Sequence, residues 1–124
     1  MINVDLMIFD VDGTLIDSRK DIVAAVNFTL KSLGLAEKGF DEIISYIGLG
    51  VGYLLKKSVG EENEDLVDKA VTVFKDYYRK HSVDSTRPYP GTIDTLEYFK
   101  DNEKTGELEL DNNWFLRMAF SLEI

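Results

Sequence analysis

The sequence contains no cysteine in its 124 residues, which excludes a disulfide framework and any thiolate metal site. It has no apolar run of the length that a membrane-spanning helix requires. Basic residues are few: 14 Lys and Arg stand against 23 Asp and Glu, and the formal net charge is −9. This balance argues against nucleic acid or an anionic membrane as a partner. The first apolar run is short and flanked by Asp5 and Asp10, so we expect no signal peptide and a cytoplasmic protein.

The most informative feature is a pair of aspartates directly after that apolar run. The run, Leu6–Phe9, lacks strict alternation, which is typical of a strand buried on both faces. It ends in Asp10, and Asp12 follows two residues later. Sites in open α/β sheets form beyond the carboxyl ends of the strands, so Asp10 occupies a position where chemistry is expected.

The spacing of the two carboxylates suits phosphoryl transfer. One carboxylate can attack a phosphoryl group and carry it as an acyl phosphate, while the other protonates the leaving oxygen and then activates water. Two acids this close repel, and a divalent cation such as Mg²⁺ would help to keep both charged. Gly13 allows a sharp turn in which its backbone and Thr14 could receive phosphate oxygens. An Asp-rich turn of the calcium-binding kind, or a solvated loop, is the alternative.

Residues 10–18 read Asp-Val-Asp-Gly-Thr-Leu-Ile-Asp-Ser. This segment closely resembles the first motif of the haloacid dehalogenase-like (HAD) hydrolases, Asp-x-Asp-Gly-Thr-Leu-x-Asp-Ser. The resemblance implies that Asp10 is the nucleophile and Asp12 the general acid and base. It also implies that Mg²⁺ binds the Asp10 carboxylate and the Asp12 backbone carbonyl, and that the fold is α/β with a HAD-like (Rossmann-type) core.

Apolar residues at helical spacing predict that helices dominate the chain. Ser18-Arg19-Lys20-Asp21 reads as a capping box that opens a helix ending at Gly34. The first and fourth helices should pack against each other through Val26, Leu30, Phe74 and Tyr77. The second, third, fourth and fifth predicted helices cover residues 41–46, 53–59, 61–81 and 92–101.

The predicted helices imply three parts: residues 1–16 with the first core strand and catalytic loop, residues 17–82, and residues 83–124 returning to the core. The middle part resembles the four-helix cap of phosphoglycolate-phosphatase-like HAD enzymes. Its segment Gly48-Leu49-Gly50 resembles the cap loop that leans over the active site and helps to select substrate. A plain connection between helices is the alternative for this loop.

The resemblance stops near residue 102, where a second core strand is expected. The third and fourth motifs of the family, a Lys and an acidic pair, do not follow. Ser121 after an apolar run could imitate the phosphate-binding hydroxyl of the second motif, and a plain terminal strand or helix is the alternative. We expect an incomplete chain, through truncation or a frame change, and an oligomer that covers exposed surface with residues 4–9 or 114–120.

The sequence therefore predicts a HAD-type phosphatase that hydrolyses a small phosphorylated metabolite through an aspartyl-phosphate on Asp10. Activity of this chain alone should be weak or undetectable, because the later motifs are missing. A non-catalytic, self-associating fragment or binding module is the alternative from another class. A phosphomutase relative is a third possibility, less favoured because Gly13-Thr14-Leu15 followed by Asp17-Ser18 is more typical of the phosphatases.

Overall fold

The computed structural model describes residues 9–101, and the side chains of residues 9–98. The predicted strand at residues 4–9, Lys104, Ser121 and the apolar segment 114–120 therefore lie outside the described residues, apart from Phe9. Within the described part the elements follow one another as β1 (Ile16–Asp17), α1 (Arg19–Ser32), α2 (Phe40–Ile44), α3 (Val51–Val59), a 3-10 helix (Glu61–Leu66), α4 (Val67–His81), β2 (Arg87–Pro88) and α5 (Thr92–Asp101).

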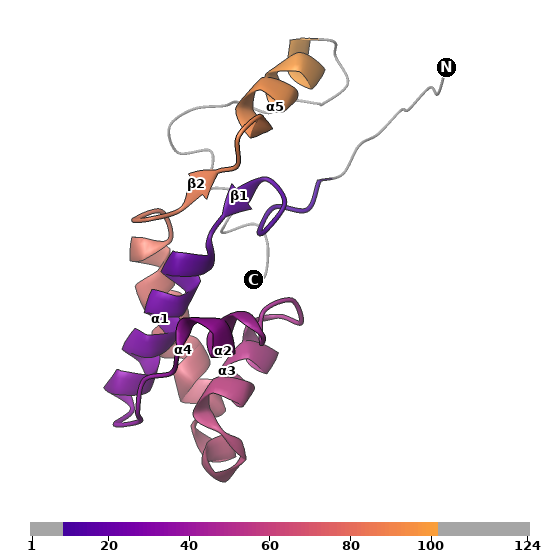
Figure 1. Ribbon diagram of the computed structural model, residues 1–124. Coiled ribbons are helices and arrows are strands. Elements are labelled where there is room, and N and C mark those ends of the chain that lie inside the picture. Colours follow the sequence, from indigo (N-terminus) through magenta and orange to yellow (C-terminus); the bar gives the residue numbers. More distant parts are fainter. Residues whose placement is uncertain (1–8, 102–124) are drawn as a thin grey trace.

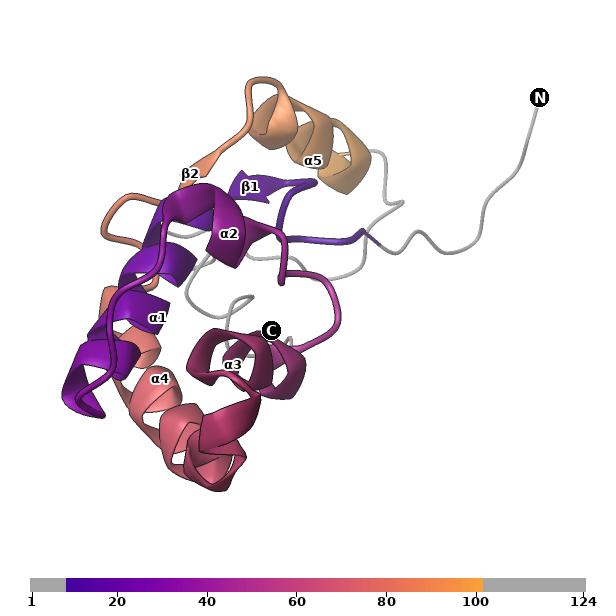
Figure 2. The same cartoon turned by 60° about the horizontal axis from the view of Figure 1, so that its bottom comes forward.

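Helices α1 to α4 form one bundle, and α5 lies at the other end of the molecule (Figure 1). Between them, β1 and β2 pair antiparallel, with Ile16 opposite Pro88 and Asp17 opposite Arg87. Two segments of the chain thus connect the α5 end of the molecule to the bundle. Residues 16–21 lead into the bundle, and residues 82–88 return from it. These two crossings are called the hinge below. Figure 2 shows the same arrangement from another side.

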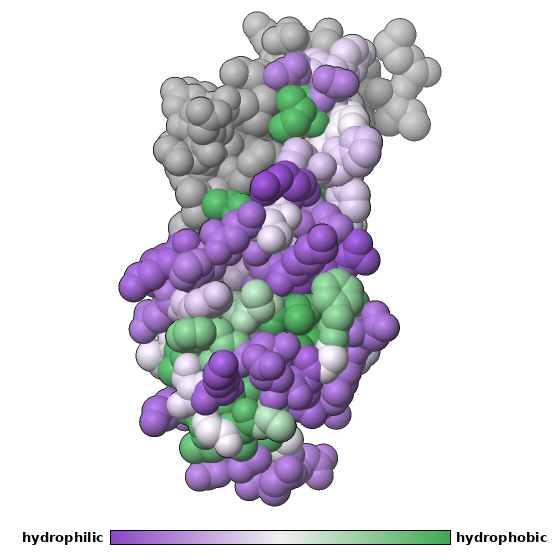
Figure 3. Space-filling model, turned by 60° about the vertical axis from the view of Figure 1, so that its left-hand side comes forward, coloured by the Kyte–Doolittle hydropathy of each residue, from purple (hydrophilic) through white to green (hydrophobic). Residues whose placement is uncertain are grey.

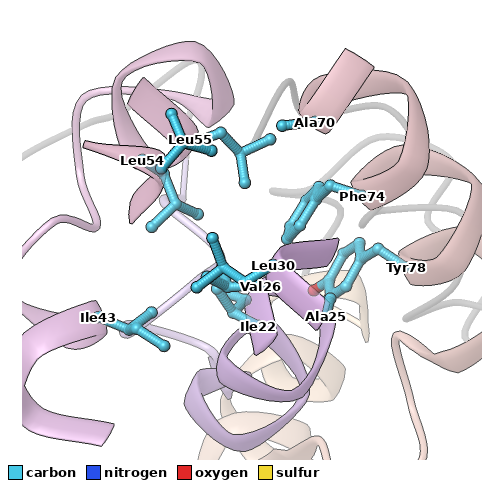
Figure 4. Packing of buried hydrophobic residues seen from close by; sticks show 11 residues of the cluster. Ile22, Ala25, Val26, Leu30, Ile43, Leu54, Leu55, Ala70, Phe74 and Tyr78 are labelled. Carbon is cyan, nitrogen blue, oxygen red and sulfur yellow. The ribbon is translucent and has the colours of Figure 1, made fainter. Parts of the chain in front are cut away.

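The bundle is built around an apolar cluster to which every one of its α-helices contributes (Figure 4). Its buried members are Ile22, Ala25, Val26, Leu30, Ile43, Leu54, Leu55, Val59, Ala70, Phe74 and Tyr78. The predicted packing of the first helix against the fourth is confirmed, because Val26, Leu30 and Phe74 share this cluster. Tyr77 lies at its margin, where its ring stacks on Phe28 with 4.1 Å between centroids.

A second, smaller cluster joins α5 to the segment that precedes β1. Val11, Leu15, Ile16 and Leu96 are buried in it, and Phe9 packs against them. The predicted α5 (residues 92–101) is confirmed, and Leu96 is its buried contact. This cluster fixes the position of the aspartate loop, residues 10–15, on α5.

The predicted bounds of α2 and α3, residues 41–46 and 53–59, differ by one or two residues from the structure, and the largest difference is at the start of the fourth helix. The helix predicted for residues 61–81 is a 3-10 helix up to Leu66, and α4 begins at Val67. Asn63 has non-helical dihedral angles (φ −116°, ψ 27°), and its side chain donates to the Val59 carbonyl oxygen at 2.9 Å. A side chain that bonds the preceding turn in this way competes with the regular helix.

The helix from Ser18 does end where predicted: α1 stops at Ser32, and Gly34 follows with φ 74°. The Gly34 and Leu35 N–H groups donate to the Lys31 and Leu30 carbonyl oxygens at 3.1 and 2.9 Å. A residue in the left-handed region is needed to make this turn, which favours glycine.

Within residues 9–101, no helix has the length and apolar character needed to cross a bilayer. Hydrophilic residues cover the middle of the molecule in Figure 3, and apolar patches emerge over the bundle. The large apolar side chains that are exposed are Phe28, Phe40, Leu49, Tyr53 and Tyr98.

Candidate active site

The aspartate loop is a tight turn held by its own backbone. The buried Val11 provides a carbonyl oxygen that accepts the N–H groups of Thr14, Leu15 and Ile16 at 3.2, 2.9 and 3.1 Å. The Gly13 N–H donates to the Ile16 carbonyl oxygen at 2.9 Å, and Gly13 has φ 77°. Residues with a β-carbon rarely adopt this φ, which explains the glycine between Asp12 and Thr14. The N–H groups of Gly13 and Thr14 are both used within the loop, so their role in binding phosphate stays a prediction.

Asp10 is exposed at the start of this loop. Its Oδ1 accepts the Val11 N–H at 3.0 Å, and its Oδ2 accepts the Thr14 hydroxyl at 3.4 Å. Each carboxylate oxygen has a second lone pair beyond these bonds. The arrangement orients the carboxylate while leaving it accessible to a ligand, as a nucleophile requires.

Asp12 is in a different environment, although it is only two residues away. It is partly buried, and its Oδ1 accepts the hydroxyl of the buried Ser18 at 2.6 Å. Burial raises the pKa of Asp12 and the nearby Asp10 charge raises it further, while the Ser18 hydrogen bond lowers it in part. The net effect favours the protonated form more than in an ordinary aspartate, which suits a general acid.

The capping box predicted for Ser18 and Asp21 is wrong. Ser18 precedes α1 but makes no side-chain cap bond, because its hydroxyl is given to Asp12. Asp21 is buried in the first turn of α1 and accepts from Ser85 and Thr86, in the return crossing of the hinge. The pattern Ser-x-x-Asp was read locally, whereas both side chains bond to residues outside the helix.

Two further residues near the aspartates were not singled out from the sequence as site residues. The Thr92 hydroxyl donates to the Leu15 carbonyl oxygen at 2.9 Å and ties the loop to the start of α5. The Tyr78 hydroxyl from α4 is buried, and no residue of the described part hydrogen-bonds to it. Burial, with the charges of Asp12 and Asp21, raises the pKa of this phenol far above its usual range. Tyr78 was predicted only as part of an apolar helix face, since helical spacing gives no sign of what its hydroxyl approaches.

The donors suit a hard cation such as Mg²⁺, since an accessible carboxylate and a backbone carbonyl are oxygen ligands. Asp10 and Asp12 are the residues that could provide them. Among residues 9–101, no group of three or more acids and histidines gathers at a point that could hold a metal ion. Most remaining ligands of a cation at Asp10 would therefore be water, substrate or groups outside the described residues.

The glycine-rich segment predicted to select substrate is the loop between α2 and α3. Gly48 and Gly50 have φ 123° and 91°, and Leu49 between them is 72% exposed. Figures 1 and 2 both show this loop projecting from the bundle on the side of the aspartate loop. Its role in selecting substrate stays a prediction.

Comparison with known sequences identifies a family. A sequence model described as haloacid dehalogenase-like hydrolase matches residues 7–106. The phosphoglycolate phosphatase of Aquifex aeolicus is 44% identical over 95 residues, covering 77% of this chain and 43% of that protein. The phosphoglycolate phosphatase of Nitrosospira multiformis is 39% identical, covering 73% of this chain and 42% of its own length. The chain thus spans less than half the length of these relatives.

Solved structures agree on the fold. A protein from Haemophilus somnus, described as a predicted phosphoglycolate phosphatase, superimposes with a TM-score of 0.72 and 28% identity, covering 79% of this chain and 47% of that one. A predicted phosphatase from Clostridium acetobutylicum has a TM-score of 0.63 at 22% identity, covering 77% and 44%. The chain therefore has part of a HAD-like α/β core, together with the helical bundle.

Proposed function

The chain belongs to the haloacid dehalogenase-like hydrolase family, and from this premise we propose that it acts on small phosphate monoesters with Asp10 as nucleophile. The observation that carries the proposal is the contrast between two neighbouring carboxylates. Asp10 is exposed and oriented, and Asp12 is partly buried with a raised pKa. Such a pair separates the nucleophile from the acid.

In the first step an Asp10 carboxylate oxygen attacks phosphorus, and the bond from phosphorus to the ester oxygen breaks. Asp12 gives its proton to the leaving alcohol oxygen, and the phosphoryl group stays on Asp10. In the second step Asp12 takes a proton from water, and that water oxygen attacks the phosphorus. The bond from phosphorus to the Asp10 carboxylate oxygen breaks, and inorganic phosphate leaves. Asp10 is again a carboxylate, and Asp12 keeps the proton taken from water, so both side chains return to their starting states.

Asp10, through its carboxylate, and Asp12, through its backbone carbonyl, would hold Mg²⁺. The cation would offset the charge that accumulates on the phosphoryl oxygens. Ser18 holds the Asp12 side chain in place during both proton transfers. Thr14, whose hydroxyl makes only a long bond to Asp10, is placed to turn toward a phosphoryl oxygen.

The named relatives make phosphoglycolate the first substrate to test, within a class of small, phosphorylated carboxylic acids. We assign residues 17–82 as the cap and Gly48-Leu49-Gly50 as the loop that meets the organic part of the substrate. The high exposure of Leu49 supports this role. We propose the cytoplasm as the place of this reaction.

A self-associating role is the second candidate, and it does not exclude the first. Phe28 and Phe40 are both more than 40% exposed on the bundle. The face of the bundle in Figure 3 carries apolar patches. Exposed apolar surface of this kind favours association with a second copy. Light scattering over a range of concentrations distinguishes an assembling chain from a monomer.

The proposed activity is tested by phosphate release from a panel of small esters with and without Mg²⁺. Asp10→Asn should abolish release, whereas Asp17→Asn, in the same motif but paired with Arg19 at the surface, should retain it. Turnover by the 124-residue chain alone should be slow, since each absent charge-stabilising donor costs on the order of 10²–10³ in rate. Measurable release above the uncatalysed rate that is equal in Asp10→Asn and the unaltered chain would contradict the proposal.

A further inference from the structure

The hinge has very little regular structure to fix its geometry. Its two strands are two residues long and pair through Ile16 with Pro88 and Asp17 with Arg87. Beside them, the Tyr89 N–H donates to the Leu15 carbonyl oxygen at 3.1 Å. A ladder this short resists rotation poorly, because few hydrogen bonds define its plane. Yet the bundle and the aspartate loop meet through this hinge (Figure 1). Something besides the strands must hold the bundle at a defined angle.

Asp21 supplies a polar clasp across the hinge. Asp21 is 4% exposed and lies in the first turn of α1. The Ser85 N–H donates to both of its oxygens, at 3.0 and 2.9 Å, and the N–H and hydroxyl of Thr86 both donate to Oδ2 at 2.7 Å. All of these donors belong to the return crossing. A carboxylate with several such donors makes strong, directional, charge-assisted bonds.

The residue directly before this turn of α1 also contacts the aspartate loop. Ser18, three residues before Asp21, donates its hydroxyl to Asp12 at 2.6 Å. Tyr78 comes from α4 and is buried where both the Asp12 and Asp21 charges act on its phenol. One helical turn therefore connects the acid of the site, the return crossing and the bundle core.

We propose that Asp21 is a positioning residue that fixes the angle between the helical bundle and the Asp10–Asp12 loop. Without its bonds to Ser85 and Thr86, the bundle rotates about the short β1–β2 pair. The role of these hydrogen bonds in holding the bundle does not depend on the proposed function. Its importance for catalysis rests on the proposed function, because an ester held between bundle and loop needs both at a constant distance.

The absence of cysteine in the sequence makes a direct distance measurement possible. Cysteines replace the exposed Asp76 on α4 and the exposed Thr95 on α5, and both carry spin labels. α5 reports on the loop because Leu96 packs against Val11. Pulsed electron resonance should give one narrow distance distribution for the otherwise unaltered chain. Asp21→Asn should shift and broaden this distance distribution. The amide nitrogen of Asn carries two N–H donors, which cannot accept hydrogen bonds from the donors of Ser85 and Thr86.

Thr29→Val is the matched control for loss of a buried polar group in the same helix. The Thr29 hydroxyl is buried and donates to the Ala25 carbonyl oxygen inside α1, so this variant should keep the narrow distribution. Thr86→Val, which removes one clasp bond, should broaden the distribution less than Asp21→Asn. Thr86→Ser, which keeps the hydroxyl, should restore it.

If Asp21→Asn does not fold, the comparison of Thr86→Val with Thr86→Ser decides. A distribution that is unchanged in the variants that lose clasp bonds, or equally broadened in Thr29→Val, overturns the proposal. Steady-state kinetics provide a separate readout: kcat/KM should fall in Asp21→Asn and recover in Thr86→Ser relative to Thr86→Val. A freed bundle with unaltered kcat/KM would overturn the positioning role. A freed bundle in a chain whose measurable phosphate release is unaffected by Asp10→Asn would leave the clasp standing and refute the proposed function.

Discussion

The helical bundle buries one apolar cluster, whereas the hinge and the aspartate loop beside it are held by polar side chains and short backbone turns. In the bundle, the burial of Phe74 and Leu30 away from water stabilises the fold. This hydrophobic contribution has no preferred direction, so it does not depend on an exact alignment of the two side chains. In the hinge, Asp21 and Thr86 gain stability only while donor and acceptor keep their geometry. We therefore expect the bundle to supply most of the folding energy, and the hinge to supply the precision that the proposed reaction would require.

The largest effect should come from opening the bundle core. Phe74→Ala removes a fully buried ring and should lower the free energy of unfolding by about 3–5 kcal/mol. Urea denaturation followed by circular dichroism measures the loss. Lys75→Ala, at the next, exposed position of α4, should change stability little. Equal losses in the two variants would show that the apolar cluster is not the main source of stability.

A smaller effect should follow from straining the end of α1. Gly34→Ala places a β-carbon at φ 74°, which should cost about 1–2 kcal/mol, since no atom lies within 4 Å of that position to add a clash. Gly39→Ala is the matched control, because Gly39 has φ −67° and equally open surroundings. Thermal unfolding should show a lower Tm for the first variant and an equal or higher Tm for the second.

On the polar side of the comparison, Thr92→Val removes the hydroxyl that bonds the Leu15 carbonyl oxygen while keeping the side-chain shape. The expected loss is about 1 kcal/mol, limited because the Tyr89 N–H still donates to the same oxygen at 3.1 Å. Hydrogen exchange should become faster in the aspartate loop and stay unchanged in α4. Faster exchange throughout α4 would show that loop and bundle unfold as one unit.

The smallest effect concerns pH. Folding raises the pKa of Asp12, chiefly through burial, so its contribution to stability is present below the unfolded value near 3.8 and is lost as pH rises through the folded value. Asp12→Asn removes the charge and keeps an acceptor for Ser18. It should raise stability at pH 7 and have less effect near pH 3.5, because the cost of burying the Asp12 charge is present only when the group is ionised. A Tm gain that is the same at both pH values, or one matched by Asp76→Asn, would contradict this assignment.

The difference between the two regions also explains what the sequence could reveal. Helix periodicity placed Val26, Leu30 and Phe74 in one core, because burial depends on spacing along a single helix. The motif at residues 10–18 indicated Asp10 and Asp12 as site residues. Its glycine, Gly13, is the residue that the turn at φ 77° requires. Both inferences use information that is local in the chain.

The polar contacts of the hinge could not be predicted in the same way. Asp21 and its partners Ser85 and Thr86 are more than 60 residues apart, and Ser18-x-x-Asp21 offered a plausible local pairing instead. The fourth helix was predicted too long for a related reason. Acidic residues at positions 61–65 suit the start of a helix, but the Asn63 side chain competes for the preceding turn. Local rules do not decide between a near and a distant hydrogen-bond partner.

The central claim is that Asp10 carries the phosphoryl group during hydrolysis. The most direct measurement is to mix the chain with Mg²⁺ and a small phosphate ester, quench in acid within a single turnover, and map the phosphorylated peptide by mass spectrometry. We predict a phosphoryl group on the peptide containing Asp10, absent in Asp10→Asn. A phosphorylated peptide elsewhere in the chain, or phosphorylation that persists in Asp10→Asn, would contradict the claim.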